Sequence, residues 1–344
     1  MYSESDLDAA VAAGKLSAGE ADKFRAFIAE QKIAPAVDEE YVRLITGFND
    51  IFVSIAIILV LTAIGTLTLP TGSPGLCVAA ASWGLAEYFT RQRRMALPSI
   101  LLLLTYILGI SSALVWIIGF NFATGLGLIF GHAVSPPGTD ALLLGPLLIG
   151  AATYAHWRRF HVPITIAAGA GGVIFFGLAM LLGLIPSLRP FAPELLLACG
   201  LAVFTLGLRW DMADRARLTR RTDVAFWLHL LAAPLIVHPL FHLLGLLHGN
   251  ADASSAVAAI AIYLGLGLVA LLVDRRALLV SGLFYLFSAL SAVLKATGVL
   301  GHGLAVTALV AGAALLLLSA FWHKARQGVM IFVPASLRQM LPPT

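Results

Sequence analysis

Charged residues are scarce in this sequence: only 12% of its 344 residues are Asp, Glu, Lys or Arg, whereas 60% are hydrophobic. The mean hydropathy is +0.93. A soluble domain needs polar side chains on its surface and cannot bury this share of apolar residues in one core. The composition therefore excludes a soluble globular protein. Long apolar runs account for the excess, and runs of about 18 residues or more are typical of membrane spans, because the hydrocarbon layer is roughly 30 Å thick.

Cysteine is almost absent. Cys77 and Cys199 both lie in apolar stretches, which is typical of small buried thiols. There is no Cys-x-x-Cys and no disulfide framework. A secretory signal peptide is not expected either, because residues 1–48 are too charged and the first apolar run, which starts near Ile51, is long enough to be retained as a span.

The charge of the chain is divided unevenly. Residues 1–48 hold nine of the eighteen acidic residues and only five bases, so the rest of the chain carries the excess of Lys and Arg. These bases are not interleaved with aromatic residues as in a nucleic-acid-binding surface, and no nucleic-acid partner is expected. The basic excess is better explained by the orientation of the chain in a lipid bilayer.

The N-terminal segment has the pattern of a short helical hairpin. Ser5 is placed to cap a helix over residues 6–13, which Gly14 closes. Ser17-Ala-Gly-Glu20 fits a capping box and opens a second helix that runs to about Lys32. The sequence therefore predicts an acidic cytoplasmic helical segment over 1–48, a transmembrane domain over 49–322 and a cytoplasmic or interfacial tail over 323–344.

The fold class predicted for this transmembrane domain is all-α, a polytopic membrane protein of about ten helices arranged as five hairpins. The expected spans, in order, are 49–69, 75–90, 97–119, 141–156, 162–185, 191–208, 223–247, 254–273, 277–296 and 302–322. Five hairpins that each end in a basic cluster are explained by internal duplication or simply by short loops. The stretch Phe120–His132 does not fit this array and is expected to be a short interfacial or re-entrant piece.

The positive-inside rule sets the orientation, since Lys and Arg favour the cytoplasmic side. With both termini cytoplasmic, fifteen of the seventeen bases after residue 48 lie in cytoplasmic loops or in the tail, and only Arg189 and Lys295 lie outside. The loop Arg209–Arg221 is explained either as a topology anchor or as an amphipathic helix on anionic headgroups. The expected location is a bacterial inner membrane.

The most distinctive local pattern is "FWLHLLAAPLIVHPLFHLL" in the seventh span. His238 and His242 are four residues apart, so on a helix they lie about 40° apart on one face. Pro234 and Pro239 remove amide donors and free the carbonyls four residues before them, which include that of Leu235. Irregular backbone and ionisable groups at membrane depth are typical of substrate or ion pathways.

In the predicted topology the pair lies in the outer half of the membrane, and His132 and His302 lie on the same side. These residues form the predicted substrate or proton pathway, together with Pro239. Because imidazole binds transition metals and haem well, His238 and His242 are also candidate metal ligands. The simpler alternative is that they only bond to water, carbonyls or headgroups. No Glu accompanies the pair as in His-Glu-x-x-His, and no catalytic residue is assigned.

The opening "LDAAVAAGKLSAGEADKFRAFI" resembles the start of a bacterial family of multi-pass proteins that begin with a Gly-Leu-Ile-Ser-x-Glu-Gln segment. Gly14, Leu16, Ser17 and Glu20 match that pattern loosely, and Lys15 and Gly19 depart from it. The resemblance implies a multi-pass membrane protein and brings no activity or functional residue. The ten-span layout with both ends inside is also similar to that of drug/metabolite transporters.

Three functions remain open from the sequence. The first is a transporter or permease with an outward-facing histidine site. The second is a membrane redox protein that binds haem or a metal, although the sequence identifies no cofactor. The third is a non-catalytic assembly protein that docks a cytoplasmic protein partner through residues 1–48. The kinked seventh span favours the first of these.

Overall fold

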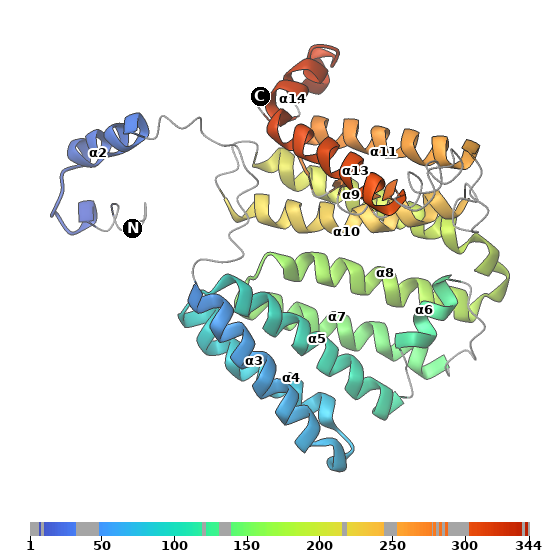
Figure 1. Cartoon of the computed structure of the whole chain (residues 1–344). Helices are drawn as coiled ribbons and strands as arrows, with labels where there is room; N and C mark the ends of the chain where they lie inside the picture. Colours follow the sequence, from blue (N-terminus) through green and yellow to red (C-terminus); the bar gives the residue numbers. More distant parts are fainter. Residues whose placement is uncertain are drawn as a thin grey trace. The chain divides into compact units, whose positions relative to one another are not determined.

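The computed structural model describes residues 7, 10–31, 48–118, 122–130, 139–214, 219–243, 253–276, 278–279, 282–283, 286–287, 303–338 and 341–342. All regular elements within these residues are helical (Figure 1). The chain divides into two compact units, Met1–Val42 and Arg43–Thr344.

The first unit confirms the predicted capping box. Helix α2 (Ala18–Gln31) begins directly after Ser17. The Ser17 hydroxyl and amide donate to the Glu20 carboxylate at 2.6 and 2.9 Å, and the Glu20 amide donates back to the Ser17 hydroxyl at 3.3 Å. The bonds from the hydroxyl and the amide hold the pKa of Glu20 below its ordinary value. Gly14 has φ 65°, the left-handed conformation expected of a residue that closes a helix.

The second unit contains the apolar helices. They are α3 (Phe48–Leu67), α4 (Pro74–Ala86), α5 (Ala96–Ile118), α6 (Phe122–Phe130), α7 (Thr139–Phe160), α8 (Ile164–Leu184), α9 (Ala192–Ala213), α10 (Arg220–Leu243), α11 (Ala253–Val273), α13 (Gly303–Ala320), α14 (Trp322–Met330) and α15 (Ala335–Arg338). Shorter turns are η1 (Leu69–Thr71), the π-helical η2 (Glu87–Gln92) and η3 (Pro186–Phe191). Nine of the ten predicted spans coincide with a helix, and the span predicted over 277–296 lies mostly outside the described residues.

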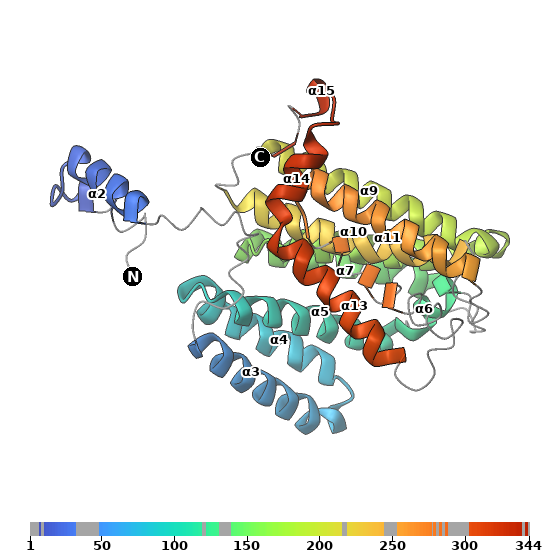
Figure 2. The same ribbon diagram turned by 45° about the horizontal axis from the view of Figure 1, so that its top comes forward.

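Several of these helices are suited to cross a membrane. Five are long and apolar enough: α3, α5, α8, α10 and the continuous helix formed by η3 with α9. Helices α13 and α14, which are bent by 71° at their junction, give a sixth if they form one span (Figure 2). The all-helical, membrane-spanning character predicted from composition is therefore present. The other predicted spans do not meet this test within the described residues, so the number ten stays a prediction.

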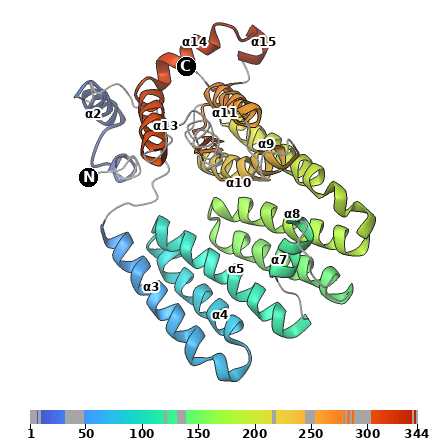
Figure 3. The ribbon, with the colours of Figure 1, turned by 45° about the vertical axis from the view of Figure 1, so that its right-hand side comes forward.

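Neighbouring helices pack closely where glycine removes the side chain. Helices α3, α4 and α5 lie side by side (Figure 3), and a Cβ on Gly109 of α5 would lie 2.7 Å from the carbonyl oxygen of Gly75 on α4. The glycine-rich stretch 167–172 of α8 behaves similarly. Gly169 faces Thr153 of α7, and Gly171 faces Leu231 of α10. Small residues that let helices approach are the expected means of packing in lipid.

The connections after α5 and after α9 differ in how far they follow the predicted boundaries. The stretch after the third span is a separate short helix, α6, which packs against α8 and α9 through Leu128 and Ile129. This agrees with the prediction of a distinct short piece. The basic loop predicted over 209–221 is wrong in extent: α9 continues to Ala213 and α10 begins at Arg220. The last turn of α9 therefore carries residues that the sequence assigned to a loop.

Candidate functional site

Helices α9 and α10 form the central pair of the candidate site. The buried face of α9 carries Gly200, Gly207 and Asp211. A Cβ on Gly200 would lie 2.8 Å from the carbonyl of Leu235 on α10. This is the carbonyl to which Pro239 cannot donate, because proline lacks an amide hydrogen. The two helices thus touch backbone to backbone near their middle, and a candidate site lies toward each end of the pair.

The first site is a cavity of about 610 Å³ at the end of the pair formed by the start of α9 and the end of α10. It is lined mainly by apolar side chains, and three nitrogen-bearing side chains interrupt them: Arg189 of η3 and His238 and His242 of α10. We call it the histidine cavity. Among the residues that the structure describes, its lining is Ile129, Phe130, Arg189, Pro190, Ala192, Pro193, Leu196, His238, Pro239 and His242.

Three of the predicted pathway residues therefore share one cavity: His238, Pro239 and His242. The ring of His238 lies edge-on to that of Phe130 on α6, with centroids 5.1 Å apart. His132 and His302, the other two, lie outside the described residues. Among the residues that the structure describes, no group of three or more His, Cys, Asp or Glu side chains converges on a common point. The predicted metal pair thus has no third ligand of these types there, whereas structural and catalytic zinc sites use at least three protein ligands.

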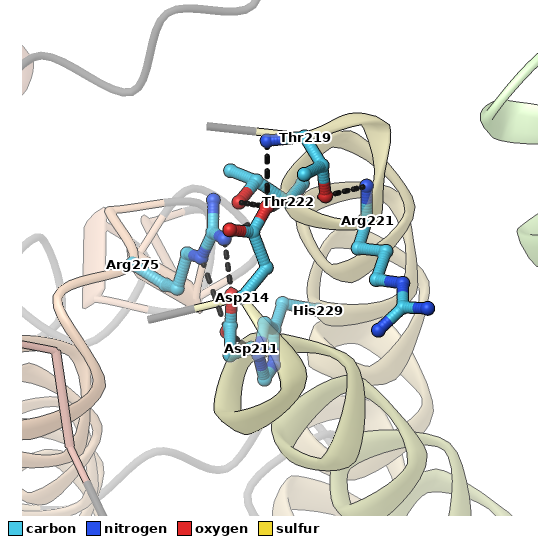
Figure 4. A network of polar contacts seen from close by, with 7 residues as sticks. All are labelled: Asp211, Asp214, Thr219, Arg221, Thr222, His229 and Arg275. Carbon is cyan, nitrogen blue, oxygen red and sulfur yellow. Dashed lines mark hydrogen bonds and ion pairs between the residues drawn. The ribbon is translucent and has the colours of Figure 1, made fainter. Parts of the chain in front are cut away.

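The second site is a buried ionic cluster toward the opposite end of the pair, where α9 ends and α10 begins (Figure 4). Asp211 is 5% exposed, His229 of α10 is fully buried and Arg275, which follows α11, is 1% exposed. The His229 Nε2 atom lies 2.8 Å from Asp211 Oδ2, and the Arg275 guanidinium donates to both carboxylate oxygens. Arg275 also donates to the carbonyl of Thr222 at 3.3 Å. One cluster therefore joins α9, α10 and the segment that follows α11.

The charges of this cluster balance. An ionised carboxylate only accepts hydrogen bonds, so His229 donates through Nε2–H. Its Nδ1 atom has no hydrogen-bond partner within the described residues. The negative charge of Asp211 is matched by the Arg275 guanidinium. Gly207 makes room for the ring, since a Cβ there would lie 3.0 Å from His229 Cε1.

A second carboxylate connects the same helix ends. Asp214 Oδ2 accepts from the Thr219 amide at 2.8 Å, the Thr219 hydroxyl at 2.6 Å and the Thr222 hydroxyl at 3.2 Å (Figure 4). The Thr219 hydroxyl in turn accepts from the amide of Arg221 at 3.3 Å and caps α10. Asp214 therefore fixes the start of α10 against the end of α9.

Helix α14 is held by a related set of contacts. Trp322 Nε1 of α14 donates to Asp274 Oδ1 at 2.8 Å, and Arg326 Nε donates to the carbonyl of Leu271 at 3.2 Å. Arg326 lies 3.8 Å from Asp274 as an ion pair. Both Arg275 and Arg326 had been counted among cytoplasmic loop bases, yet both are at least 98% buried. Two of the bases that were used to predict the orientation are thus buried inside the protein, where they bind other residues of the chain.

Sequence reasoning did not select Asp211, His229 or Arg275. Asp211 was part of a basic loop, Arg275 was part of a basic hairpin end, and His229 stood in the apolar seventh span without a role. One signal was available in the sequence. Asp211 and Asp214 are two acidic residues within an otherwise basic stretch, which suggests that they pair with bases of the protein. Their pairing to residues up to 64 positions away was not encoded locally.

These features define an all-helical protein with several helices suited to span a membrane, a largely apolar cavity at one end of its α9–α10 pair and a charge-balanced ionic cluster toward the other end. Compared with protein-family models, with curated proteins and with solved structures, the chain finds no match.

Proposed function

We propose that this chain is a transporter-like protein of a bacterial inner membrane, with ten spans and both termini in the cytoplasm, and that the histidine cavity is its substrate site. Two observations support the topology: nine helices coincide with predicted spans, and most bases after residue 48 fall on one side of such an array. In this topology the histidine cavity faces outward and the ionic cluster lies near the cytoplasmic boundary.

The observation that carries the proposal is the asymmetry of the α9–α10 pair. One end holds a cavity lined by His238 and His242, and the ion pair between Asp211 and Arg275 holds the other end together. Alternating access requires a closed path on one side of a substrate site while the other side is open. An ionic cluster at one end and a cavity at the other on the same helix pair fit one state of such a cycle.

Glycine contacts between α9 and α10 support the same view. At Gly200 the backbones of the two helices meet directly, and at Gly207 the His229 ring of α10 packs against the backbone of α9, so the helices are suited to move as a rigid pair. Breaking the Asp211–Arg275 contact would remove the charged link between this pair and the segment that follows α11, leaving the bond from Arg275 to the Thr222 carbonyl. The ionic cluster is accordingly proposed as the cytoplasmic closure.

The test is solute uptake by proteoliposomes that contain the purified protein, with radiolabelled organic anions, neutral solutes and cations compared against empty vesicles. We expect uptake of at least one class, and loss of uptake when His238 and His242 are both changed to Ala. The matched control is His323→Gln, because His323 is exposed on α14 and does not line the cavity. The proposal fails if no solute enters faster than in empty vesicles, or if the double variant transports as well as the control.

The topology is tested separately with tags at the two ends. Both tags should be reached only by reagents applied to the cytoplasmic face of sealed vesicles. Reaction of the two tags from opposite faces would overturn the even number of spans.

A further inference from the structure

Three cationic or hydrogen-bonding nitrogen groups enter the histidine cavity from two separate elements. Arg189 comes from η3, and His238 and His242 come from α10. None of the described residues that line the cavity carries a carboxylate. A cation placed there would meet the charge of the Arg189 guanidinium with no acid among the lining residues to offset it, whereas an anion would be attracted.

The side chain of Arg189 is held in place by a hydrogen bond. Its Nε–H donates to the carbonyl of Leu182 at the end of α8 at 3.1 Å, and the side chain is half-buried. Its terminal nitrogens make no hydrogen bond to the residues that the structure describes, so a bidentate acceptor such as a carboxylate has two donors available to it. Guanidinium groups bind carboxylates in this paired geometry more strongly than neutral groups do.

The rest of the lining is apolar. Ile129 and Phe130 of α6 and Leu196 of α9 supply most of it, together with prolines. A volume of about 610 Å³ is within the range of sites that enclose a small organic molecule. An inorganic anion would leave these apolar side chains in contact with water, so the ligand should also carry an apolar group.

From these features, and resting on the proposed function, we infer that the substrate is an organic anion that carries an apolar group, with its anionic end bound by Arg189 and the histidines. A free carboxylate and the headgroup region of an anionic lipid share this chemistry. The experiment separates these two sources.

The probes are three tritiated compounds of the same shape: naphthoate, its neutral amide and naphthylmethylammonium. Binding is measured by scintillation proximity on purified protein in nanodiscs of phosphatidylcholine, with and without phosphatidylglycerol. We expect naphthoate to bind, and the amide and the ammonium compound to bind at least about tenfold more weakly, since a charged hydrogen bond is lost. Equal or tighter binding of the amide or the ammonium compound overturns the inference.

The variants locate the site. Arg189→Gln and His242→Gln should each weaken naphthoate binding by about tenfold without changing the weak binding of the amide, and Arg189→Lys should restore part of it. The matched controls are Arg158→Gln, whose side chain is exposed at the end of α7, and His323→Gln. Unchanged binding in the Arg189 and His242 variants, or an equal loss in the controls, would contradict the assignment.

Two further measurements are competition by phosphatidylglycerol and uptake of naphthoate by proteoliposomes. If phosphatidylglycerol competes with naphthoate in wild-type protein but is not retained by Arg189→Gln in native mass spectrometry, the anion is supplied by the membrane; if it does not compete, the anion is a free solute. Absence of binding by naphthoate and by phosphatidylglycerol overturns the inference altogether. Naphthoate binding without any uptake by proteoliposomes would instead reject the proposed function and leave the ligand class standing.

Discussion

Replacing Asp211 with Asn tests the buried ionic cluster most directly. The substitution keeps the shape of the side chain and one acceptor oxygen, but it removes the negative charge. The Arg275 guanidinium, which is 1% exposed, would then have lost the carboxylate that accepts from two of its nitrogens. The new amide would also place N–H donors toward groups that are themselves donors.

The magnitude follows from burial. Because Asp211 and Arg275 are both at least 95% buried, water does not screen the loss. Breaking a buried pair by removing one partner costs about 3 to 5 kcal/mol, whereas replacing both partners with apolar residues of similar volume is often nearly neutral. We therefore expect Asp211→Asn to lower the free energy of unfolding by about 3 to 5 kcal/mol. The double variant Asp211→Leu, Arg275→Met should lie closer to wild type than either single variant does.

The assay is unfolding in mixed micelles by titration with SDS, followed by intrinsic tryptophan fluorescence. Glu87→Gln is the control, since it removes a carboxylate that Arg159 binds through two nitrogens at 2.6 and 2.8 Å but whose ion pair is partly exposed. Solvent screening makes its expected loss much smaller. The reasoning is refuted if the free energy of unfolding of Asp211→Asn lies within about 1 kcal/mol of the wild-type value. It is also refuted if the double variant is less stable than both single variants.

The remaining predictions concern packing, the N-terminal unit and the cavity. Gly200→Ala should destabilise the protein by about 1 to 3 kcal/mol, because the new Cβ would overlap the Leu235 carbonyl. The control is Gly150→Ala, where no atom of the described residues lies within 4 Å of the new Cβ, and it should unfold no more easily than wild type in the same titration. A loss of equal size in the control would refute the steric argument. The capping bonds of Glu20 should be present above its ordinary pKa of 4.5 and be lost as the pH falls through its lower folded pKa. NMR titration of the Glu20 side-chain carbons should give a midpoint below 4.5 that rises in Ser17→Ala, and an unchanged midpoint would show that Ser17 is not the cause. Optical spectroscopy and metal analysis of the purified protein should find no stoichiometric haem or transition metal bound through His238, and a stoichiometric metal lost with His238→Ala would favour the redox alternative over transport.

The sequence predicted the helical elements well because each has a local cause. Helix α10 was expected over 223–247 and is described over Arg220–Leu243, and α2 begins where Ser17 and Glu20 form their capping box. The four-residue spacing of His238 and His242 puts them on one helical face, because a helical repeat fixes that relation whatever surrounds it, and both line the histidine cavity. Pro239 joins them in the cavity for the same reason.

Contacts between distant segments were beyond that kind of reasoning. Arg189 was noted only as a base on the unfavoured side of the membrane, and it lines the cavity because η3 brings it to the end of α10. Asp211 and Arg275 are 64 residues apart, and the polar residues of a helix end give no sign of which distant residue they will meet.

By itself, then, the sequence determined that this chain is helical, that its long apolar runs suit a membrane and where most helices begin and end, because hydrophobicity, capping and helical periodicity act within a few residues along the chain. Only the tertiary structure decided which end of α9 and α10 holds a cavity and where buried charges close the pair, since both depend on side chains that folding brings together from separate helices.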